Sequence, residues 1–248
     1  MEKKVDEFLS RATAENTPLS TALEQFLACE VNALINRRIE YRVKESKLLH
    51  KKLLADFDFV FQSGVDKTLV MELATLGFVS RKQGLIIGGQ SGTGKSHIAQ
   101  ALLLLGCQKC YRCLYTTASA MIKNLLASLA DNSLDQKLRM YTTPELLLID
   151  ELGFDRLEQE SARNATLFFK VIDGRYCKNS TIITTNIDFK ELGDYLGDPT
   201  ITTAIVDRMV HHSIVMTING PSWRMHESKK INTIPSSSGE KKITLTKV

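Results

Sequence analysis

The sequence contains no apolar run long enough to cross a membrane. A bilayer-spanning helix needs about 20 consecutive apolar residues, whereas the longest uncharged apolar stretch runs only from Ala99 to Cys107. The first ten residues, MEKKVDEFLS, also lack the apolar core of a secretory signal. We therefore expect a cytoplasmic protein that has no membrane partner.

Cysteine is also scarce, and its pattern is incomplete for a metal site. Three of the five cysteines, Cys107, Cys110 and Cys113, stand close together in CQKCYRC. A closed zinc site needs four ligands, and no second CxxC motif or His pair supplies further ligands for these three cysteines. The segment falls between an expected helix and an expected strand, so we expect the sulfurs to point apart. The pattern favours free thiols, as is usual in a reducing compartment.

Charge is not scarce, but it is unevenly distributed. The 248 residues have a net charge of +4. Residues 37–52 contain seven Lys and Arg against two Glu, and the segment from Arg224 onward contains six against two. Such asymmetry favours a polyanionic partner, although a solvated helix face is the alternative. The basic residues of the first segment are Arg37, Arg38, Arg42, Lys44, Lys47, Lys51 and Lys52.

The chain divides into a helical N-terminal part and a part in which strands and helices alternate. Apolar residues recur at helical spacing between residues 17 and 54, which predicts two or three helices in a small all-α domain. From about residue 65, five β-rich runs are separated by helical stretches. This alternation predicts an α/β fold with a five-stranded parallel sheet covered by helices. The Ser- and Lys-rich end is typical of a flexible tail.

A glycine-rich run, GQSGTGKS, matches the pattern G-x-x-x-x-G-K-[ST] between an expected strand and an expected helix. Glycines let backbone N–H groups curl around phosphate oxygens, and the helix N-terminus attracts the same anion. Lys95 would contact the β- and γ-phosphates, and Ser96 would bind Mg²⁺. The predicted ATP site consists of Gly89, Gln90, Ser91, Gly92, Thr93, Gly94, Lys95 and Ser96.

A second motif, LLLIDE, is an apolar run that ends in Asp150 and Glu151. Because side chains alternate along a strand, we expect the two carboxylates to face different ways. Asp150 is suited to hold Mg²⁺ through water, and Glu151 is suited to polarise an attacking water. The pair favours hydrolysis over a small-molecule kinase, which must exclude water. The sequence therefore predicts an ATPase with ATP and Mg²⁺ as cofactors.

Three further polar residues stand at the ends of expected elements. Asn186 ends the run STIITTN and is placed to orient the lytic water, with a turn-forming role as the alternative. Arg208 and Arg224 flank the last expected strand, and either guanidinium could cover charge on the γ-phosphate. Surface salt bridges are the alternative for both arginines. Spacing alone does not assign either one to its own subunit or to a neighbour.

The motifs occur in the order GQSGTGKSH, LLLIDELG, FFKVIDGRY, STIITTN, GDPTITTAIVDRMVHHS and NGPSWR. This order strongly resembles the IstB-like transposition helper ATPases of insertion sequences, and more loosely the DnaC helicase loaders. Both groups belong to the initiator clade of AAA+ P-loop NTPases. The resemblance is dense from about residue 56 to 227 and weaker in the basic N-terminal segment.

The resemblance implies roles for particular residues. It implies that Arg208 is an arginine finger reaching a neighbour's ATP, that Asn186 is sensor 1 and that Arg224 is a candidate second sensor. The segment ADFDF is similar to a linker that packs on adenine, which implies that Phe57 and Phe59 contact the base. The helix in DNSLDQKLRMY resembles an insertion turned toward DNA. The phosphate contacts that this implies are Lys123, Lys137 and Arg139.

The resemblance also implies a division of labour along the chain. Residues 1–60 would form a helical, basic DNA-binding domain with a linker, 61–228 the AAA+ ATPase domain, and 229–248 a flexible basic tail. Subunits would oligomerise on duplex DNA, bend or mark it, and recruit the transposase of the same element, with ATP hydrolysed between subunits. The alternative is a helicase loader that binds single-stranded DNA and a hexameric helicase. A scaffold that binds ATP without using its hydrolysis is a further alternative.

Overall fold

The computed structural model describes residues 17–154, 162–188 and 198–232, together with the isolated residues 8, 14, 15 and 191. Strands and helices alternate in it from residue 84 onward. In chain order the elements are α2 (Leu19–Glu45), η1 (Leu54–Asp56), α3 (Lys67–Ala74), α4 (Gly77–Ser80), β1 (Gly84–Gly89), α5 (Lys95–Gln108), β2 (Cys113–Thr117), α6 (Ala118–Ala127), α7 (Leu134–Thr142), β3 (Leu146–Leu152), α8 (Ala162–Arg175), β4 (Ser180–Thr185), α10 (Pro199–His211), β5 (Ser213–Ile218) and α11 (Trp223–Asn232).

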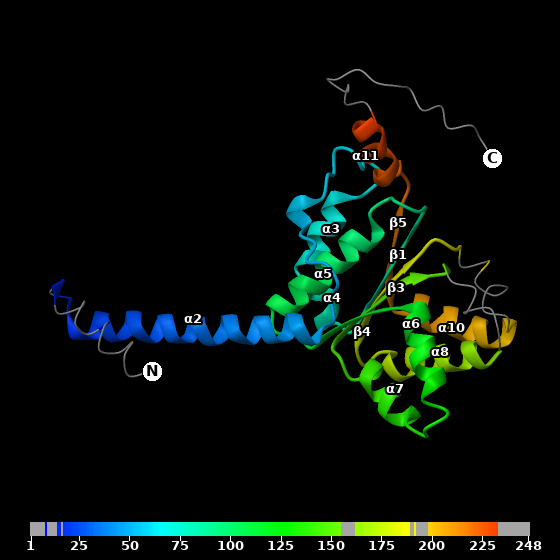
Figure 1. Ribbon diagram of the computed structural model, residues 1–248, viewed down its shortest axis with the longest axis horizontal. Helices are drawn as coiled ribbons and strands as arrows, with labels where there is room; N and C mark the ends of the chain where they lie inside the picture. Colours follow the sequence, from blue (N-terminus) through cyan, green and yellow to red (C-terminus); the bar gives the residue numbers. More distant parts are fainter. Residues whose placement is uncertain are drawn as a thin grey trace, which may run out of the picture.

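Five parallel strands form one sheet in the order β2-β3-β4-β1-β5. Helices α3, α4 and α5 cover one face, and α6, α7, α8 and α10 cover the other (Figure 1). The predicted five-stranded parallel α/β core is confirmed. Because the carboxyl ends of parallel strands lie at one edge of a sheet, the segments that follow β1, β3 and β4 meet there.

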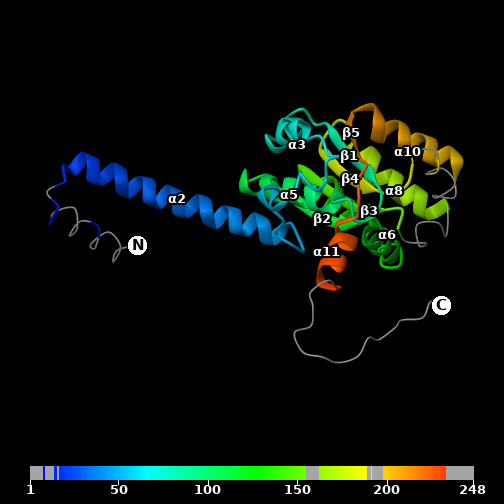
Figure 2. The same cartoon turned by 90° about the horizontal axis from the view of Figure 1, so that it is seen from above.

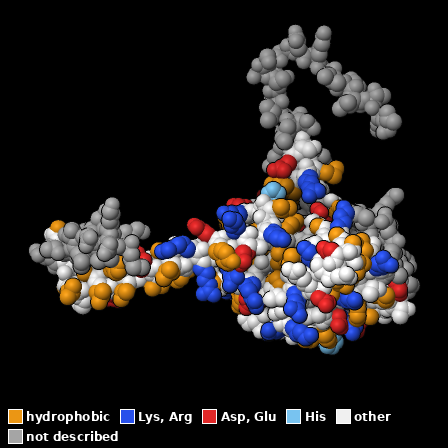
Figure 3. Space-filling view, turned by 60° about the horizontal axis from the view of Figure 1, so that its bottom comes forward, with side chains coloured by type: hydrophobic (Ala, Val, Ile, Leu, Met, Phe, Trp, Pro, Cys, Tyr) orange, Lys and Arg blue, Asp and Glu red, His pale blue; other side chains and the backbone are white. Residues whose placement is uncertain are grey.

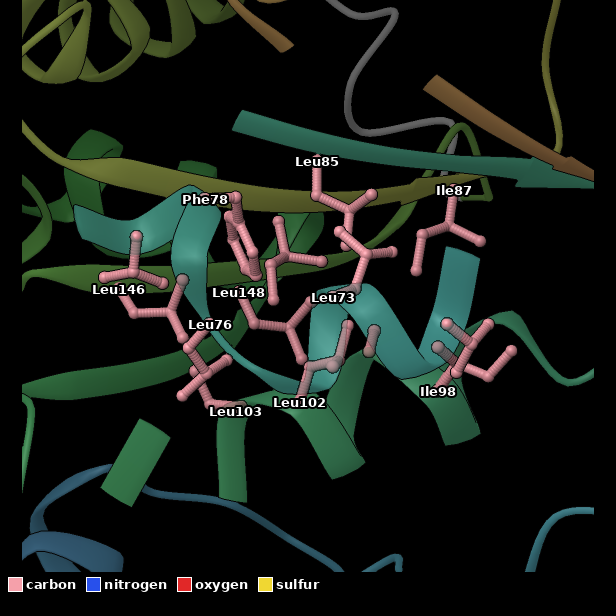
Figure 4. Packing of buried hydrophobic residues seen from close by; sticks show 14 of the residues in the cluster. Leu73, Leu76, Phe78, Leu85, Ile87, Ile98, Leu102, Leu103, Leu146 and Leu148 are labelled. Atoms are coloured by element: carbon pink, nitrogen blue, oxygen red, sulfur yellow. The ribbon is translucent and has the colours of Figure 1, made fainter. Parts of the chain in front are cut away.

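The strands are buried on both faces, so their side chains alternate between two apolar clusters. Leu85 and Ile87 of β1 face the first cluster together with Ile98 and Leu102 of α5 (Figure 4), whereas Ile86 faces the second. None of these five side chains is more than 1% exposed. Removing each from water contributes about 1.5–3 kcal/mol. This packing holds the strand and the helix that flank the glycine-rich turn at fixed positions.

The N-terminal segment forms one long helix, α2, and the prediction of two or three helices is wrong. The sequence of α2 contains neither glycine nor proline, the residues that interrupt helices most readily. Its 27 residues make it about 40 Å long, at about 1.5 Å per residue. The helix projects away from the core (Figure 1 and Figure 2), and its C-terminal end packs against α5 and β2.

The segment between α2 and α3, which we call the linker (residues 46–66), packs on the core. Leu48, Leu54, Phe57 and Phe59 join the first apolar cluster. The predicted boundary at residue 60 therefore falls inside a segment that is folded against the ATPase part.

The C-terminal boundary predicted at residue 229 also lies inside an element, because α11 continues to Asn232. Residues 233–248 of the predicted tail lie outside the described residues. Among the described helices, none combines the length and the apolar character that a bilayer span requires.

Candidate nucleotide site

The glycine-rich turn, or P-loop, follows the carboxyl end of β1. Gly92 and Gly94 have φ angles of +80° and +96°, a backbone conformation that residues with a Cβ rarely adopt. A Cβ on Gly94 would lie 2.6 Å from the ring of Phe57, and one on Gly92 would lie 2.2 Å from Ser222 Oγ. Glycine at these two positions allows the turn and leaves room for the segments that close over it.

Lys95 is the first residue of α5 and is only 6% exposed. Its Nζ donates to the carbonyl oxygens of Gly89 and Gln90, each at 2.7 Å. Burial lowers the pKa of Lys95, the Asp150 carboxylate raises it, and the Arg224 guanidinium lowers it. An anion in the loop would favour the charged ammonium, so phosphate binding and protonation of Lys95 support each other.

Asp150 lies near the carboxyl end of β3, is 2% exposed, and is surrounded by donors. Ser96 Oγ donates to its Oδ1 at 2.8 Å, and Thr184 Oγ1 donates to the same oxygen. Gln100 Nε2 and Tyr115 OH donate to Oδ2 at 3.4 and 3.5 Å. Burial and the nearby carboxylates raise the pKa of Tyr115 well above its usual value, so its hydroxyl keeps the proton that it donates.

These donors and acceptors fit a hydrated Mg²⁺. The Ser96 hydroxyl and the Asp150 carboxylate are oxygen ligands of the type that Mg²⁺ prefers. Gln100 Oε1 is buried and has no hydrogen-bond partner within the described residues. It can accept a hydrogen bond from a metal-bound water, which would satisfy this buried acceptor.

Both carboxylates of the acidic pair line the same cavity, so the expectation that they face different ways is wrong. Between Ile149 and Leu152, β3 contains a bulge in which Asp150 and Glu151 together stand opposite Thr184 alone. Glu151 has a φ of +63°. The bulge interrupts the strand alternation and turns the exposed Glu151 toward the cavity that Asp150 also borders.

A cavity of about 620 Å³ lies over the P-loop, within the usual range for a bound small molecule. The linker and the start of α11 supply three of its aromatic lining residues, Phe57, Phe61 and Trp223. The rings of Phe61 and Trp223 meet edge to face, with centroids 4.9 Å apart. Phe59, predicted to contact adenine, is not among the lining residues and packs on Phe57 and under Lys67 Nζ instead.

Sequence reasoning missed several residues of this site. Gln62 is 3% exposed and donates from Nε2 to the carbonyls of Thr93 at 2.8 Å and Pro221 at 3.2 Å. It therefore joins the linker, the P-loop and the segment before α11. Thr184 and Trp223 were missed as well, since each contributes through contacts with distant segments. Their only local signals are position: Thr184 lies two residues before Asn186, and Trp223 precedes Arg224.

The three polar residues predicted near the γ-phosphate are not brought together. Arg224 lines the cavity, whereas Arg208 and Asn186 do not. Asn186 is exposed just after β4. Arg208 lies on α10, where its Nε pairs with Asp173 Oδ1 at 2.8 Å and its guanidinium lies 4.8 Å from the ring centroid of Phe169.

The predicted DNA contacts form two groups. On α2 and the linker, all seven basic residues are exposed except Arg42, which pairs with Glu45 at 3.1 Å. Lys and Arg side chains gather where α2 joins the core (Figure 3). Lys137 and Arg139 lie on α7, while Lys123 lies on α6, and both helices cover the sheet face opposite to α5.

Cys107 and Cys113 lie against each other, so the expectation that these sulfurs point apart is wrong. Both side chains belong to the first apolar cluster, and the interaction with Cys107, followed by burial, raises the pKa of Cys113. Cys107 Sγ also approaches the carbonyl of Arg42 at 3.7 Å. All five cysteines are free thiols, as predicted. The described part of the chain contains no group of three or more His, Cys, Asp or Glu placed to hold a metal.

The fold and the site together define a P-loop ATPase of the AAA+ class. The model of the IstB-like ATP binding protein family matches residues 1–231, and the chain belongs to this family. It is 35% identical over 241 residues to the ATP-binding protein assigned to insertion sequence IS21 of Pseudomonas aeruginosa, covering 95% of this chain and 90% of that protein. It is 34% identical to the one assigned to IS5376 of Geobacillus stearothermophilus, covering 88% and 86%.

A solved structure with the same fold is that of the DnaC helicase loader. It superposes with a TM-score of 0.53 and 22% identity, covering 61% of this chain and 87% of the loader. At this identity the likeness concerns the fold alone. The predicted family, the AAA+ fold and the ATPase class are confirmed.

Proposed function

We propose that this protein is an ATP-dependent transposition helper. Its subunits assemble on duplex DNA, bend or mark the target, and recruit and activate the transposase of the same element. ATP is bound and hydrolysed between adjacent subunits. Similarity to proteins named for insertion sequences supports this proposal, and the position of Arg208 is the observation that carries it.

Arg208 lies at the sheet edge opposite to the P-loop. It borders a small cleft with Gly84 and Ser213, the first residues of β1 and β5. The P-loop follows the other end of β1, whose six residues span about 20 Å. An arginine side chain does not bridge that distance. A γ-phosphate contacted by Arg208 therefore belongs to the nucleotide of a neighbouring subunit.

The contacts of Arg208 hold it in a position that a neighbour can approach. Asp173 fixes Nε, the carbonyl of Ala204 accepts from one terminal nitrogen at 3.2 Å, and Phe169 supports the guanidinium plane. The side chain is nevertheless 30% exposed. A guanidinium held this way can stabilise charge on a phosphoryl group without losing much side-chain freedom.

Within each subunit, the remaining groups divide the work of hydrolysis. The P-loop and Lys95 hold the phosphates, and Ser96 with Asp150 holds Mg²⁺, which when bound neutralises phosphate charge. Glu151 polarises the attacking water. Arg224 borders the cavity of its own subunit and serves as the second sensor, and Asn186, directly after the strand β4 that pairs with β3, orients the water.

The basic residues of α2 and the linker supply the DNA contacts in this proposal. Arg37, Arg38 and Lys44 are exposed on α2, which projects from the ATPase core, and the basic residues of the linker are exposed beside that core. Lys and Arg on an exposed arm suit backbone phosphates, so binding is expected to fall steeply with salt and to depend little on base sequence. Bending a short site costs about 1–6 kcal/mol, which phosphate contacts from several assembled subunits can offset.

Mixing of variant subunits tests the shared active site. Lys95→Ala protein cannot bind ATP productively, and Arg208→Ala protein cannot complete its neighbour's site. Each alone should hydrolyse ATP poorly, and a mixture should recover activity because Lys95→Ala subunits still supply Arg208. Arg224→Ala is the matched control, since a residue acting in its own subunit is not rescued by mixing. No recovery with Arg208→Ala would contradict the inter-subunit site.

DNA preference and partner capture test the rest. We expect tighter ATP-dependent binding to duplex than to single-stranded DNA, a duplex whose ends approach on binding, and retention of the element's own transposase on that complex. Circularisation or fluorescence transfer between duplex ends measures the bend. Preference for single strands together with binding of a hexameric helicase would instead favour the loader function.

A further inference from the structure

We propose that Thr184 is the positioning residue that sets the carboxylates of Asp150 and Glu151 for hydrolysis. Thr184 lies on β4, directly across from the bulge in β3, and is 1% exposed. The inference rests on the roles proposed above for the two carboxylates. It goes beyond those roles because it states that the positions of both carboxylates depend on a side chain of the neighbouring strand.

One hydroxyl makes both contacts. Thr184 Oγ1 donates to Asp150 Oδ1 and accepts from the backbone N–H of Glu151 at 2.9 Å. A hydroxyl has one proton and two lone pairs. An ionised carboxylate only accepts, so the proton is directed to Asp150, and a lone pair remains for the N–H of Glu151. The same oxygen atom therefore fixes both the carboxylate of Asp150, which is proposed to hold Mg²⁺, and the backbone of Glu151, which is proposed to polarise the water.

The contact with Glu151 supports an unfavourable backbone conformation. Glu151 has a φ of +63°, in a region that residues other than glycine seldom occupy and that must be held by its surroundings. In a bulge, the extra residue also loses its partner in the strand ladder. The Thr184 hydroxyl gives the Glu151 N–H a partner at this point. It thereby stabilises the turn of backbone that directs Glu151 to the cavity.

The contact with Asp150 works together with Ser96. Both hydroxyls donate to Oδ1, while Gln100 and Tyr115 donate to Oδ2. Loss of the Thr184 hydroxyl frees one side of the carboxylate to rotate and leaves the Glu151 N–H without this acceptor. Both catalytic side chains would remain present, but their positions would shift.

The test compares Thr184→Val, which replaces the hydroxyl by a methyl group of similar size, with Thr184→Ser, which keeps it. Thr116→Val is the matched control, because Thr116 is a buried threonine on β2 whose hydroxyl donates to the Thr117 carbonyl at 3.1 Å.

We expect Thr184→Val to lower kcat for ATP hydrolysis about 10- to 100-fold, the scale of a slightly misplaced catalytic group. KM and the affinity for a fluorescent ATP analogue should stay within about 3-fold, since phosphate binding is unchanged. Thr184→Ser should recover most of kcat, and Thr116→Val should keep it.

Three results would overturn the inference. They are a wild-type kcat in Thr184→Val, a Thr184→Ser variant as slow as Thr184→Val, and an equal loss of kcat in Thr116→Val. The second would assign the effect to the methyl group, and the third to general loss of packing. Glu151→Gln separates this inference from the proposed function. If Glu151→Gln hydrolyses ATP normally, the role of Glu151 is wrong, whereas an inactive Glu151→Gln with a fully active Thr184→Val refutes only the role of Thr184.

Discussion

The Nε2 of Gln62 donates a hydrogen bond to the backbone carbonyl of Thr93 at 2.8 Å, and so joins the linker to the P-loop. The same nitrogen donates to the carbonyl of Pro221, just before α11. The chain segments on both sides of the nucleotide cavity are therefore tied to the phosphate-binding turn by one buried amide. The linker begins directly after α2, so the segment that leads from this helix to the core is also the one that borders the nucleotide cavity.

Replacing Gln62 should lower both the nucleotide affinity and the stability of the fold. Gln62→Leu leaves the buried carbonyl of Thr93 and the part-buried carbonyl of Pro221 without this donor, which costs about 1–3 kcal/mol. We expect a lower free energy of unfolding and weaker binding of a fluorescent ATP analogue. Gln83→Leu, at a half-buried glutamine whose Oε1 accepts from Arg81, is the control. Unchanged nucleotide affinity in Gln62→Leu would show that the linker does not order the P-loop.

The two phenylalanines of the linker should separate into a binding residue and a packing residue. Both rings pack against the first apolar cluster, but only Phe57 also lines the nucleotide cavity and lies against Gly94. Phe57→Ala is expected to weaken nucleotide affinity by about 1–3 kcal/mol, the range for base–aromatic stacking. Phe59→Ala is expected to lower stability with a smaller change in affinity. Nucleotide titration and urea unfolding on both variants measure this, and the reverse pattern would contradict the assignment.

Ser96 should control the response to Mg²⁺. Its Oγ donates to Asp150 at 2.8 Å, so Ser96→Ala removes an oxygen from the predicted metal site and a donor from the buried carboxylate. We expect a higher Mg²⁺ concentration for half-maximal ATP hydrolysis, and chelation by EDTA to abolish hydrolysis in the unaltered protein. Ser128→Ala removes a buried hydroxyl at the end of α6, which donates to the Leu125 carbonyl, and should leave the Mg²⁺ dependence unchanged. Identical Mg²⁺ curves for Ser96→Ala and the unaltered protein would exclude this role.

Arg175 should be important for stability. It is 1% exposed, and its guanidinium donates to the carbonyls of Tyr141 and Pro144, each at 2.8 Å, and to the Thr181 hydroxyl. Burial lowers its pKa to about 9. Lysine cannot reproduce the fork of donors, so Arg175→Lys is expected to cost about 3 kcal/mol in the free energy of unfolding.

Arg112→Lys, at an exposed and loosely paired position, should change stability by less than about 0.5 kcal/mol. Urea denaturation of both variants, with nucleotide affinity as a check on the P-loop, measures the difference. Equal stability of Arg175→Lys and Arg112→Lys would contradict the structural role.

Local sequence was sufficient for the parts of the site that are continuous in the chain. The eight P-loop residues are consecutive, because the backbone N–H groups of a single turn surround a phosphate. The acidic pair follows directly after an apolar strand, and apolar, β-rich runs between helical stretches mark five strands and their helices. Such features depend on neighbours a few residues away, and they were predictable for that reason.

Features that depend on contact between distant segments were not predictable. Strand alternation places Asp150 and Glu151 on opposite sides, but pairing of β3 with β4 introduces a bulge that turns both to one cavity. Phe57 and Phe59 look equivalent in the sequence, and only packing of the linker places one of them in the cavity. Helix α2 is a different case, because its continuity follows from a local property, the absence of glycine and proline, which apolar periodicity does not include.

The sequence by itself determined that this protein binds a nucleoside triphosphate on a parallel α/β sheet, because the P-loop and each buried strand consist of consecutive residues. Only the tertiary structure decided which side chains share the cavity with Glu151, and that Arg208 lies at the far edge of the sheet. The physical reason is that strand order and register, which no local pattern encodes, set the distance between residues that are far apart in the chain.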